Sequence, residues 1–274
     1  TAYSAPGGNE GYTINYANET VTANSGYEVK LSNSNDWITS GTSLTITPGS
    51  TFQVRHGKTA DGAPASEPLT VNVEARPAVP TFAIDNEDEG VTIPSGYSYN
   101  TTSEDYSNTW TPGDGSLVKI EPGNSIYIYK AATESTFKSA VQTLAAPERA
   151  SAPTLPTINY EDEALSSTTT AMEYRVGDTG EWGKCTADMS LVDIGWTGTE
   201  MTVYFRTAAT DANYASNPTA GLTIPARPAA PNVQGVNETV AGRNDGRITG
   251  LTAGTAYEIS SDDGQSWQYA ELTG

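Results

Sequence analysis

The sequence of 274 residues contains one cysteine, Cys185, and one histidine, His56. An intrachain disulfide is excluded, and a Cys/His zinc site or a set of Cys–His nucleophile pairs has too few residues. We expect His56 at an exposed strand end, and Cys185 as either a buried thiol or an exposed odd cysteine. No apolar run approaches the ~18 residues of a membrane helix, so membrane insertion is not expected. No signal peptide opens the sequence, so we expect a mature or excised piece.

Basic residues are also scarce. Fourteen Lys and Arg stand against 33 Asp and Glu, which leaves a net charge of -19 and a pI near 4.2. Such a field repels phosphate polyanions, so nucleic acid and anionic membranes are excluded as expected partners, while cations and neutral ligands are favoured. Apolar residues make up only 36% of the chain, which suits several small cores rather than one large core.

An internal repeat with a period of about 75 residues is the strongest signal in the sequence. Four kinds of marker recur: an arginine followed by Pro or Ala and a later Pro, a strand that ends in a basic residue, a serine after a small or basic residue, and a tryptophan. The arginines are Arg76, Arg149 and Arg227, the basic strand ends are Arg55, Lys130 and Arg206, the serines are Ser66, Ser139 and Ser216, and the tryptophans are Trp37, Trp110, Trp182 and Trp267. The predicted repeats are 1–76, 77–150, 151–227 and 228–274. The last contains only the first half of a repeat, which would leave edge strands unpaired.

Within a repeat the apolar residues alternate with polar ones, as in residues 27–31 (YEVKL) and 69–73 (LTVNV). This period of two predicts half-buried antiparallel strands, and turn residues separate the runs at the spacing of a β-sandwich. The predicted fold is all-β: tandem small Ig-like antiparallel β-sandwiches joined by short Pro-containing linkers. Each sandwich should have its own core, with Val54, Ile128 and Phe205 at equivalent inward positions. The best helix candidate, residues 133–141, is weak.

Residues 245–251 (DGRITGL), 257–260 (YEIS) and 203–216 resemble the tandem bacterial Ig-like or fibronectin-III-like repeats of Gram-positive cell-surface proteins. The resemblance covers most of the chain at the level of the repeat. In such proteins these repeats are spacers, adhesive modules or accessory domains of glycan-degrading enzymes. The resemblance therefore implies an extracellular protein, either secreted or on the bacterial cell surface.

Residues 260–267 fit the pattern Ser-x-Asp-x-Gly-x-x-Trp, and Ser103, Asp105 and Trp110 form a degraded copy of it. The pattern resembles the Asp-box of sialidase-like propellers, where it is a hairpin clasp remote from catalysis. The residue types agree with that role, because Asp accepts hydrogen bonds from turn amides and Gly adopts positive φ. A structural role is therefore the preferred interpretation, with a ligand role as the alternative.

The four periodic tryptophans are the candidate ligand-binding residues, because sugar rings stack on exposed aromatic side chains. Recurrence in every repeat also suits a role in the fold. We predict that Trp110 and Trp182 are mostly buried against their own hairpins, and that an exposed tryptophan face would instead indicate a glycan site.

Two acidic runs, residues 85–89 and 161–163, suggest a calcium site near the linkers, since hard cations prefer clustered carboxylate oxygens. The first run imitates the start of an EF-hand loop but lacks the final glutamate and the flanking helices. A solvated loop is the preferred interpretation. No cofactor is therefore expected, with calcium as the possible exception. The candidate ligands are Asp85, Glu87, Asp88, Glu161 and Asp162.

The predicted function is that of a non-enzymatic stalk and adhesion module of a bacterial surface protein, and we expect a monomer. A binding module for host or dietary glycans or for a glycoprotein such as mucin or immunoglobulin is the alternative, as is an accessory region of a secreted glycan-degrading enzyme. Catalysis is disfavoured because the carboxylates do not align between repeats, and sandwiches of this size lack the volume for a cleft.

Overall fold

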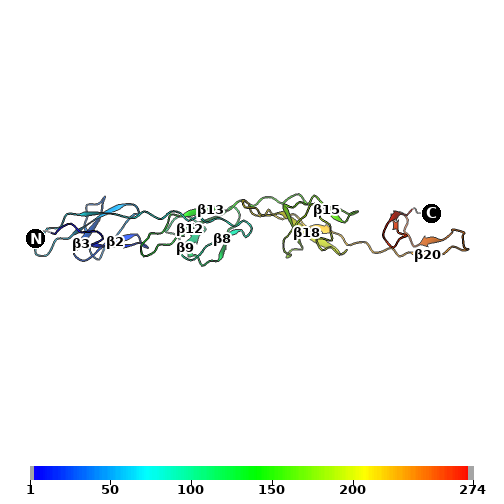
Figure 1. Cartoon of the computed structure of the whole chain (residues 1–274), viewed down its shortest axis with the longest axis horizontal. Helices are drawn as coiled ribbons and strands as arrows, with labels where there is room; N and C mark the ends of the chain where they lie inside the picture. The colour runs from blue at the N-terminus through cyan, green and yellow to red at the C-terminus, as the bar shows by residue number, and fades with distance from the viewer. Residues whose placement is uncertain (1–2, 271–274) are drawn as a thin grey trace.

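The computed structural model describes residues 3–270, and within this range it contains short β-strands and no helix. The units follow one another along one long axis (Figure 1). The predicted ranges serve below as names for the first to fourth repeats. Residues 133–141, the weak helix candidate, form an irregular loop that leads into a strand. No helix in the described range is long and apolar enough to cross a bilayer.

Two sheets form each of the first three repeats. The first repeat contains β1 (Tyr12–Asn15), β2 (Thr20–Ala23), β3 (Tyr27–Leu31), β4 (Ile38–Thr39), β5 (Ser43–Thr45), β6 (Thr51–His56) and β7 (Leu69–Asn72). The second contains β8 (Gly90–Thr92), β9 (Tyr97–Asn100), β10 (Thr111–Pro112), β11 (Leu117–Lys119), β12 (Ser125–Lys130) and β13 (Gln142–Ala145). The third contains β14 (Thr157–Asn159), β15 (Ala164–Ser166), β16 (Met172–Val176), β17 (Gly183–Lys184), β18 (Met201–Thr207) and β19 (Leu222–Ile224).

The same strand order recurs in all three repeats. The larger sheet has the order β4-β3-β6-β7 in the first repeat, β10-β9-β12-β13 in the second and β17-β16-β18-β19 in the third. The smaller sheet is β1-β2-β5, β8-β11 or β14-β15, and every strand pair is antiparallel. The chain is thus a tandem array of all-β Ig-like sandwiches.

The core of each repeat lies between its two sheets, because alternate side chains of each strand point inward. In the first repeat Val21 of β2, Val29 of β3 and Val54 of β6 belong to one fully buried cluster. Ile128 and Phe205 are buried just as completely in the second and third repeats. The predicted equivalence of these three inward positions is confirmed.

The fourth repeat consists of two separate hairpins. One pairs β20 (Gln234–Val236) with β21 (Arg247–Thr249), and the other pairs β22 (Glu258–Ile259) with β23 (Gln268–Tyr269). None of the described residues 228–270 is buried. The half repeat therefore has no core of its own.

Candidate functional site

At the first two junctions, a side chain of one repeat packs in the core of the repeat before it. Phe137 lies in the loop between β12 and β13 of the second repeat, yet it packs in the core of the first repeat with Ile46 and Val73. It is 1% exposed, and its ring lies 4.8 Å from that of Tyr16. The expectation of fully separate cores is wrong here, because the first repeat buries an aromatic side chain of the second.

The second junction has the same construction. Tyr214, in the loop between β18 and β19 of the third repeat, is 3% exposed within the core cluster of the second repeat. Its hydroxyl donates a hydrogen bond of 3.1 Å to the carbonyl oxygen of Ile120. Burial raises the pKa of Tyr214, so the phenol remains a donor across the neutral range.

A buried serine holds each of these loops. The hydroxyl of Ser139 accepts a bond of 2.8 Å from the amide of Lys130 and donates one of 2.8 Å to the carbonyl of Ala140. Ser216 makes the same two bonds, to Thr207 and Asn217, at 2.9 Å each. Phe137 and Tyr214 both lie two residues before the serine. The serine marker of the sequence thus fixes the loop that presents the aromatic side chain.

An ion pair joins the linker arginine to the first repeat. Arg76 donates to both carboxylate oxygens of Glu19, at 2.7 and 2.8 Å, in the bidentate geometry typical of strong Arg–carboxylate pairs. Lys138 of the second repeat approaches the same carboxylate at 3.5 Å. The guanidinium and the ammonium both lie over the ring of Tyr106, at 4.7 and 4.3 Å from its centroid. The linker is therefore attached to both repeats.

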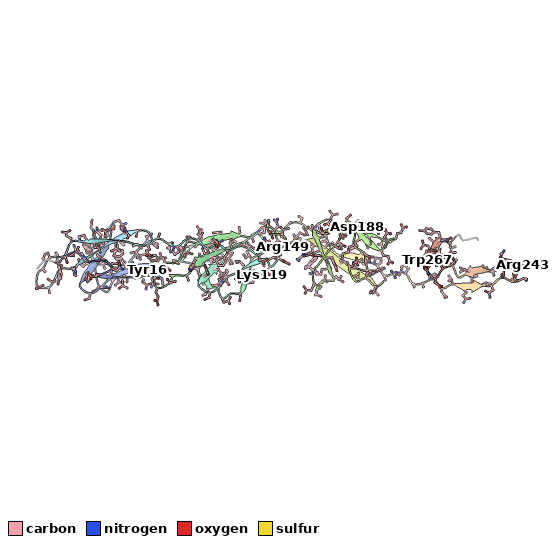
Figure 2. The ribbon with its side chains drawn as sticks, in the orientation of Figure 1. Tyr16, Lys119, Arg149, Asp188, Arg243 and Trp267 are labelled. Carbon is pink, nitrogen blue, oxygen red and sulfur yellow. The ribbon has the colours of Figure 1, made fainter. Side chains whose placement is uncertain are left out.

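Arg149 occupies the corresponding place between the second and third repeats (Figure 2). It pairs with Glu89 at 2.6 Å and donates a second bond of 2.8 Å to the carbonyl oxygen of Ala215 in the third repeat. The hydrogen bond to Glu89 raises the pKa of Arg149 further above neutrality. This arginine also contacts both of the repeats that it connects.

The glutamates of these pairs share an uncommon backbone conformation. Glu19, Glu89 and Glu163 have φ values of 56°, 50° and 48°, in the left-handed region that disfavours residues with a Cβ. Glu19, Glu89 and Glu163 directly precede β2, β8 and β15, and each pairs with the arginine of the following linker, which for Glu163 is Arg227. The turn directs the carboxylate toward the linker, at a conformational cost of about 1 kcal/mol or more.

Trp37, Trp110 and Trp182 lie on the outer face of the larger sheets and are half-buried. The guanidinium carbon of Arg55 lies 4.0 Å from the ring centroid of Trp37, and that of Arg206 lies 4.3 Å from the ring centroid of Trp182. Trp110 contacts Tyr129 at 4.6 Å. Trp110 and Trp182 are covered over most of their surface, as predicted, but the cover comes from Tyr129 and Arg206 of the neighbouring strand as well as from their own hairpins.

Trp267 of the fourth repeat is 59% exposed. The turn before it has the hydrogen bonds that the Asp-box pattern predicts: Asp262 accepts from the Ser260 hydroxyl at 2.7 Å and from the Ser266 amide at 2.9 Å. Asp105 accepts from the amide of Ser107 in the degraded copy. The pattern builds turns in both places, while the face of Trp267 stays open.

The two acidic runs do not converge. In the first run, Asp85 Oδ1 accepts hydrogen bonds of 3.0 Å from the amides of Glu87 and Asp88. In the second run, Asn159 Oδ1 accepts from the amides of Glu161 and Asp162 at 3.0 and 3.3 Å. Across residues 3–270, no three His, Cys, Asp or Glu side chains gather in a group that could hold a metal ion. Calcium binding by the predicted residues of these loops, Glu161 and Asp162 included, stays an untested prediction.

The reactive side chains are equally dispersed. His56 ends β6, as predicted, but it is half-buried, with its ring 4.6 and 4.3 Å from the rings of Tyr3 and Tyr27. Cys185 is buried, and desolvation raises the pKa of its thiol to about 11. The thiol of Cys185 is therefore held away from solvent, whereas His56 is only partly covered.

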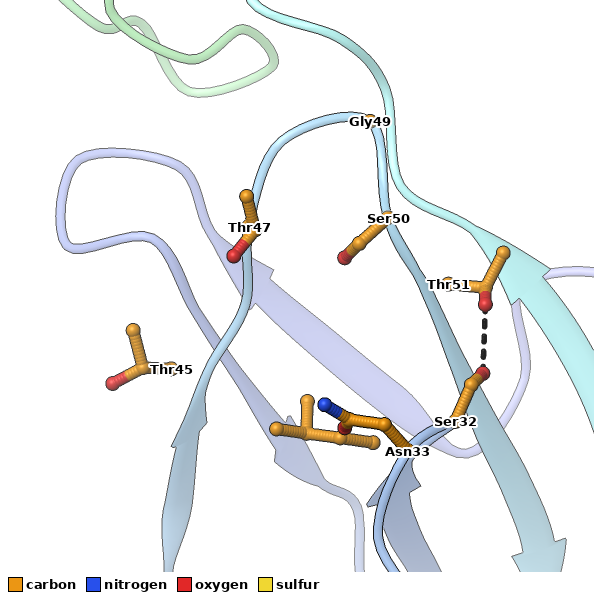
Figure 3. Close-up of a pocket in the computed structure, with 8 residues that line it drawn as sticks. Ser32, Asn33, Thr45, Thr47, Gly49, Ser50 and Thr51 are labelled. Carbon is orange, nitrogen blue, oxygen red and sulfur yellow. Dashed lines mark hydrogen bonds between the residues drawn. The ribbon is translucent and has the colours of Figure 1, made fainter.

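A hollow of about 410 Å³ lies at the edge of the first repeat, beside the hydrogen bond of 2.7 Å between Ser32 and Thr51 (Figure 3). Its lining consists of small hydroxyl and amide residues with one leucine: Leu31, Ser32, Asn33, Thr45, Thr47, Gly49, Ser50 and Thr51. It therefore offers neither a general acid or base nor a charged metal ligand.

Comparison with known proteins does not assign the chain to a family. No protein-family model matches the chain, and no curated protein matches its sequence. The FN1–FN3 domains of chicken CNTN1 in their crystal structure are similar at 11% identity, over 80% of this chain and 98% of that one, with a TM-score of 0.28. That score carries no argument, so the fold assignment rests on strand order and burial.

Sequence reasoning missed the two junction aromatics. Both Phe137 and Tyr214 lie in loops without apolar alternation, so no strand pattern marks them. Their constant position two residues before the recurrent serine was the available signal.

Proposed function

We propose that the chain is a non-enzymatic extracellular spacer that holds neighbouring parts of a bacterial surface protein apart, with adhesion as an accompanying role. The observation that carries the proposal is the insertion of Phe137 and Tyr214 into the preceding repeat. A spacer must resist bending, and the aromatic side chains buried across the first two junctions oppose rotation of one repeat against the next. The bacterial and cell-surface setting follows from the family resemblance.

The linkers add to this stiffness. Residues after the junction arginines pair with the next repeat, since Ala140 N donates to Pro77 O at 3.2 Å and Asn217 N donates to Ala150 O at 2.9 Å. A linker with satisfied backbone bonds loses the freedom of an open chain. The net charge of -19 also favours an extended, well-solvated rod.

The absence of enzymatic activity is proposed from the dispersion of reactive groups. The buried thiol of Cys185, with its raised pKa, is a poor nucleophile because only the thiolate attacks readily. His56 is stacked between two tyrosines. An assay of the purified chain against chromogenic glycosides and peptides should give no turnover above the buffer rate.

Glycan or glycoprotein binding is the second candidate. It is favoured by Trp267, which directly precedes β23 and is 59% exposed, and by Tyr269 of β23, which is 77% exposed. Exposed rings of this kind suit stacking on neutral sugars. A glycan array probed with the full chain and with Trp267→Ala tests it: signal lost in the variant would support binding by this face.

Small-angle X-ray scattering of the full chain tests the spacer. A stiff rod gives a pair-distance distribution with a long linear tail, unchanged between low and moderate salt. A compact or strongly salt-dependent profile would contradict the proposal, because it would mean that the repeats move freely about their linkers.

A further inference from the structure

An apolar hollow of about 390 Å³ lies where the third repeat meets the Arg227-Pro228 linker. Its lining comes from the turn before β15, the segment before β18, the last residue of β19 and the linker: Tyr160, Glu163, Leu191, Trp196, Ile224, Pro225, Ala226, Arg227 and Pro228. The hollow lies where the first and second repeats each receive an aromatic side chain from the repeat that follows.

The frameworks correspond position by position. The amide of Leu191 donates to the carbonyl of Glu163 at 2.8 Å, as Ile46 donates to Glu19 at 2.8 Å in the first repeat. The second repeat has the same bond, at 2.9 Å, from Ile120 to Glu89. The ion pair of the linker arginine with the turn glutamate is also repeated. The third repeat therefore has the same backbone bond and the same ion pair beside its linker as the first two repeats.

Tyr160 occupies the position of Tyr16, three residues before the turn glutamate. Tyr16 packs on Phe137, whereas Tyr160 is 69% exposed and faces no aromatic ring within the described residues. At the second junction this position is Asn86, whose amide donates a bond of 2.8 Å to the carbonyl of Asp211 in the third repeat. In both occupied junctions, then, this residue contacts the following repeat.

The ion pair between Arg227 and Glu163 is likewise more exposed than its counterparts. The side chains of Arg227 and Glu163 are 55% and 38% exposed, against 24% and 26% for Arg149 and Glu89. Trp196, from a segment longer than its counterparts in the other repeats, lies beneath Arg227 at 4.9 Å. It is buried, its Nε1 has no hydrogen-bond partner in the described part of the chain, and the hollow remains open beside it.

We propose that this hollow is a docking socket for the aromatic-bearing loop of a complete repeat of the same kind, placed after the Arg227-Pro228 linker. A loop of the Phe137 type fits best, because Tyr160 offers the same aromatic wall as Tyr16. None of the residues that line the hollow lies beyond Pro228, so the described hairpins of the fourth repeat do not cover it. The inference rests on the junction geometry that also underlies the proposed spacer function.

The test inserts a second copy of residues 77–149 between Arg227 and Pro228 of the full chain. The first residue of the copy, Pro77, then follows Arg227 as it follows Arg76 in the native chain, and the product still contains a single Tyr160. Hydroxyl-radical oxidation of Tyr160, read by mass spectrometry, should fall severalfold on insertion. It should return to the starting rate when the copy alone carries Phe137→Ala, while oxidation of Tyr269 stays constant throughout.

Unchanged oxidation of Tyr160 beside a folded copy would overturn the proposal. It would mean that no loop docks in the hollow and that Trp196 alone covers this end of the core. If the copy does not fold, the unaltered chain is titrated with a cyclic peptide of residues 125–145 and with its Phe137→Ala form. A saturable shift of the Trp196 indole NMR signal with the first peptide alone supports the socket. No shift at peptide concentrations of about 1 mM, or equal shifts with both peptides, overturns it. Neither result affects the spacer proposal, because scattering of the unaltered chain reports on the first two junctions.

Discussion

The hydroxyl of Tyr214 reaches across the second junction and donates a hydrogen bond to the carbonyl oxygen of Ile120. The tyrosine belongs by sequence to the third repeat, while Ile120 belongs to the buried core of the second. Neighbouring repeats are consequently coupled through a shared core as well as through the chain.

Tyr214→Ala should therefore destabilise the second repeat more than the third. Removing a buried aromatic side chain costs about 3–5 kcal/mol, and here the cavity opens in the core that holds Ile126 and Ile128. Hydrogen exchange should show faster opening of β12, while β18 keeps its protection. Tyr214→Phe is the matched control, with a loss of about 1 kcal/mol for the hydrogen bond. Equal loss of protection in both repeats would argue against a core shared in this way.

Trp182→Ala should cost about 1–2 kcal/mol, which is less than a core aromatic, because the ring is half-buried beneath Arg206 and Arg175. Chemical denaturation of the full chain measures the loss, with Trp267→Ala as the exposed control that changes stability by less than about 0.5 kcal/mol. A loss as large as that of a buried core residue would show that the outer face is closed rather than open.

Calcium should leave the melting temperature unchanged within about 1 °C, since Asp85 already accepts two turn amides and the acidic runs lie apart. A ligand present at a hundredfold excess over its Kd would add about 2.7 kcal/mol and raise the temperature by several degrees. Calorimetry with calcium and with EDTA decides the matter, and a rise that Asp85→Asn removes would establish a calcium site.

Asp262 should titrate at about pH 2 in the folded chain. The Ser266 hydroxyl, at 2.6 Å, and then the Ser260 hydroxyl lower the pKa of its carboxyl from 3.8 to about 2. Because the folded pKa is depressed, the stabilisation of the turn is present above pH 3.8 and disappears as the pH falls through 2. Carboxyl NMR of the full chain measures the midpoint, and Ser266→Ala should raise it. A midpoint near 3.8 would mean that the clasp is not formed in solution.

The sequence predicts the sandwiches well because strand alternation reports directly on burial, as Val54, Ile128 and Phe205 illustrate. The periodic markers also reflect physical constraints: the linker arginine pairs with a glutamate 57 to 64 residues away, and the serine supports the junction loop. The pairing itself could not be predicted, since Glu19 and Arg76 meet only after the sheets form.

The junction aromatics escaped prediction for a related reason. A single buried residue in a loop has no periodicity, and its burial depends on the neighbouring repeat rather than on its own. Phe137 is apolar and Tyr214 amphipathic, so even residue type differs between the two junctions.

Stiffness of the second junction is the property on which the spacer role depends most directly. Spin labels at Glu104→Cys in the second repeat and Thr179→Cys in the third measure it by pulsed electron resonance, since the native Cys185 is buried. We predict one narrow distance distribution that broadens when Tyr214→Ala is added. A distribution that is already broad with Tyr214 in place would contradict the rigid junction.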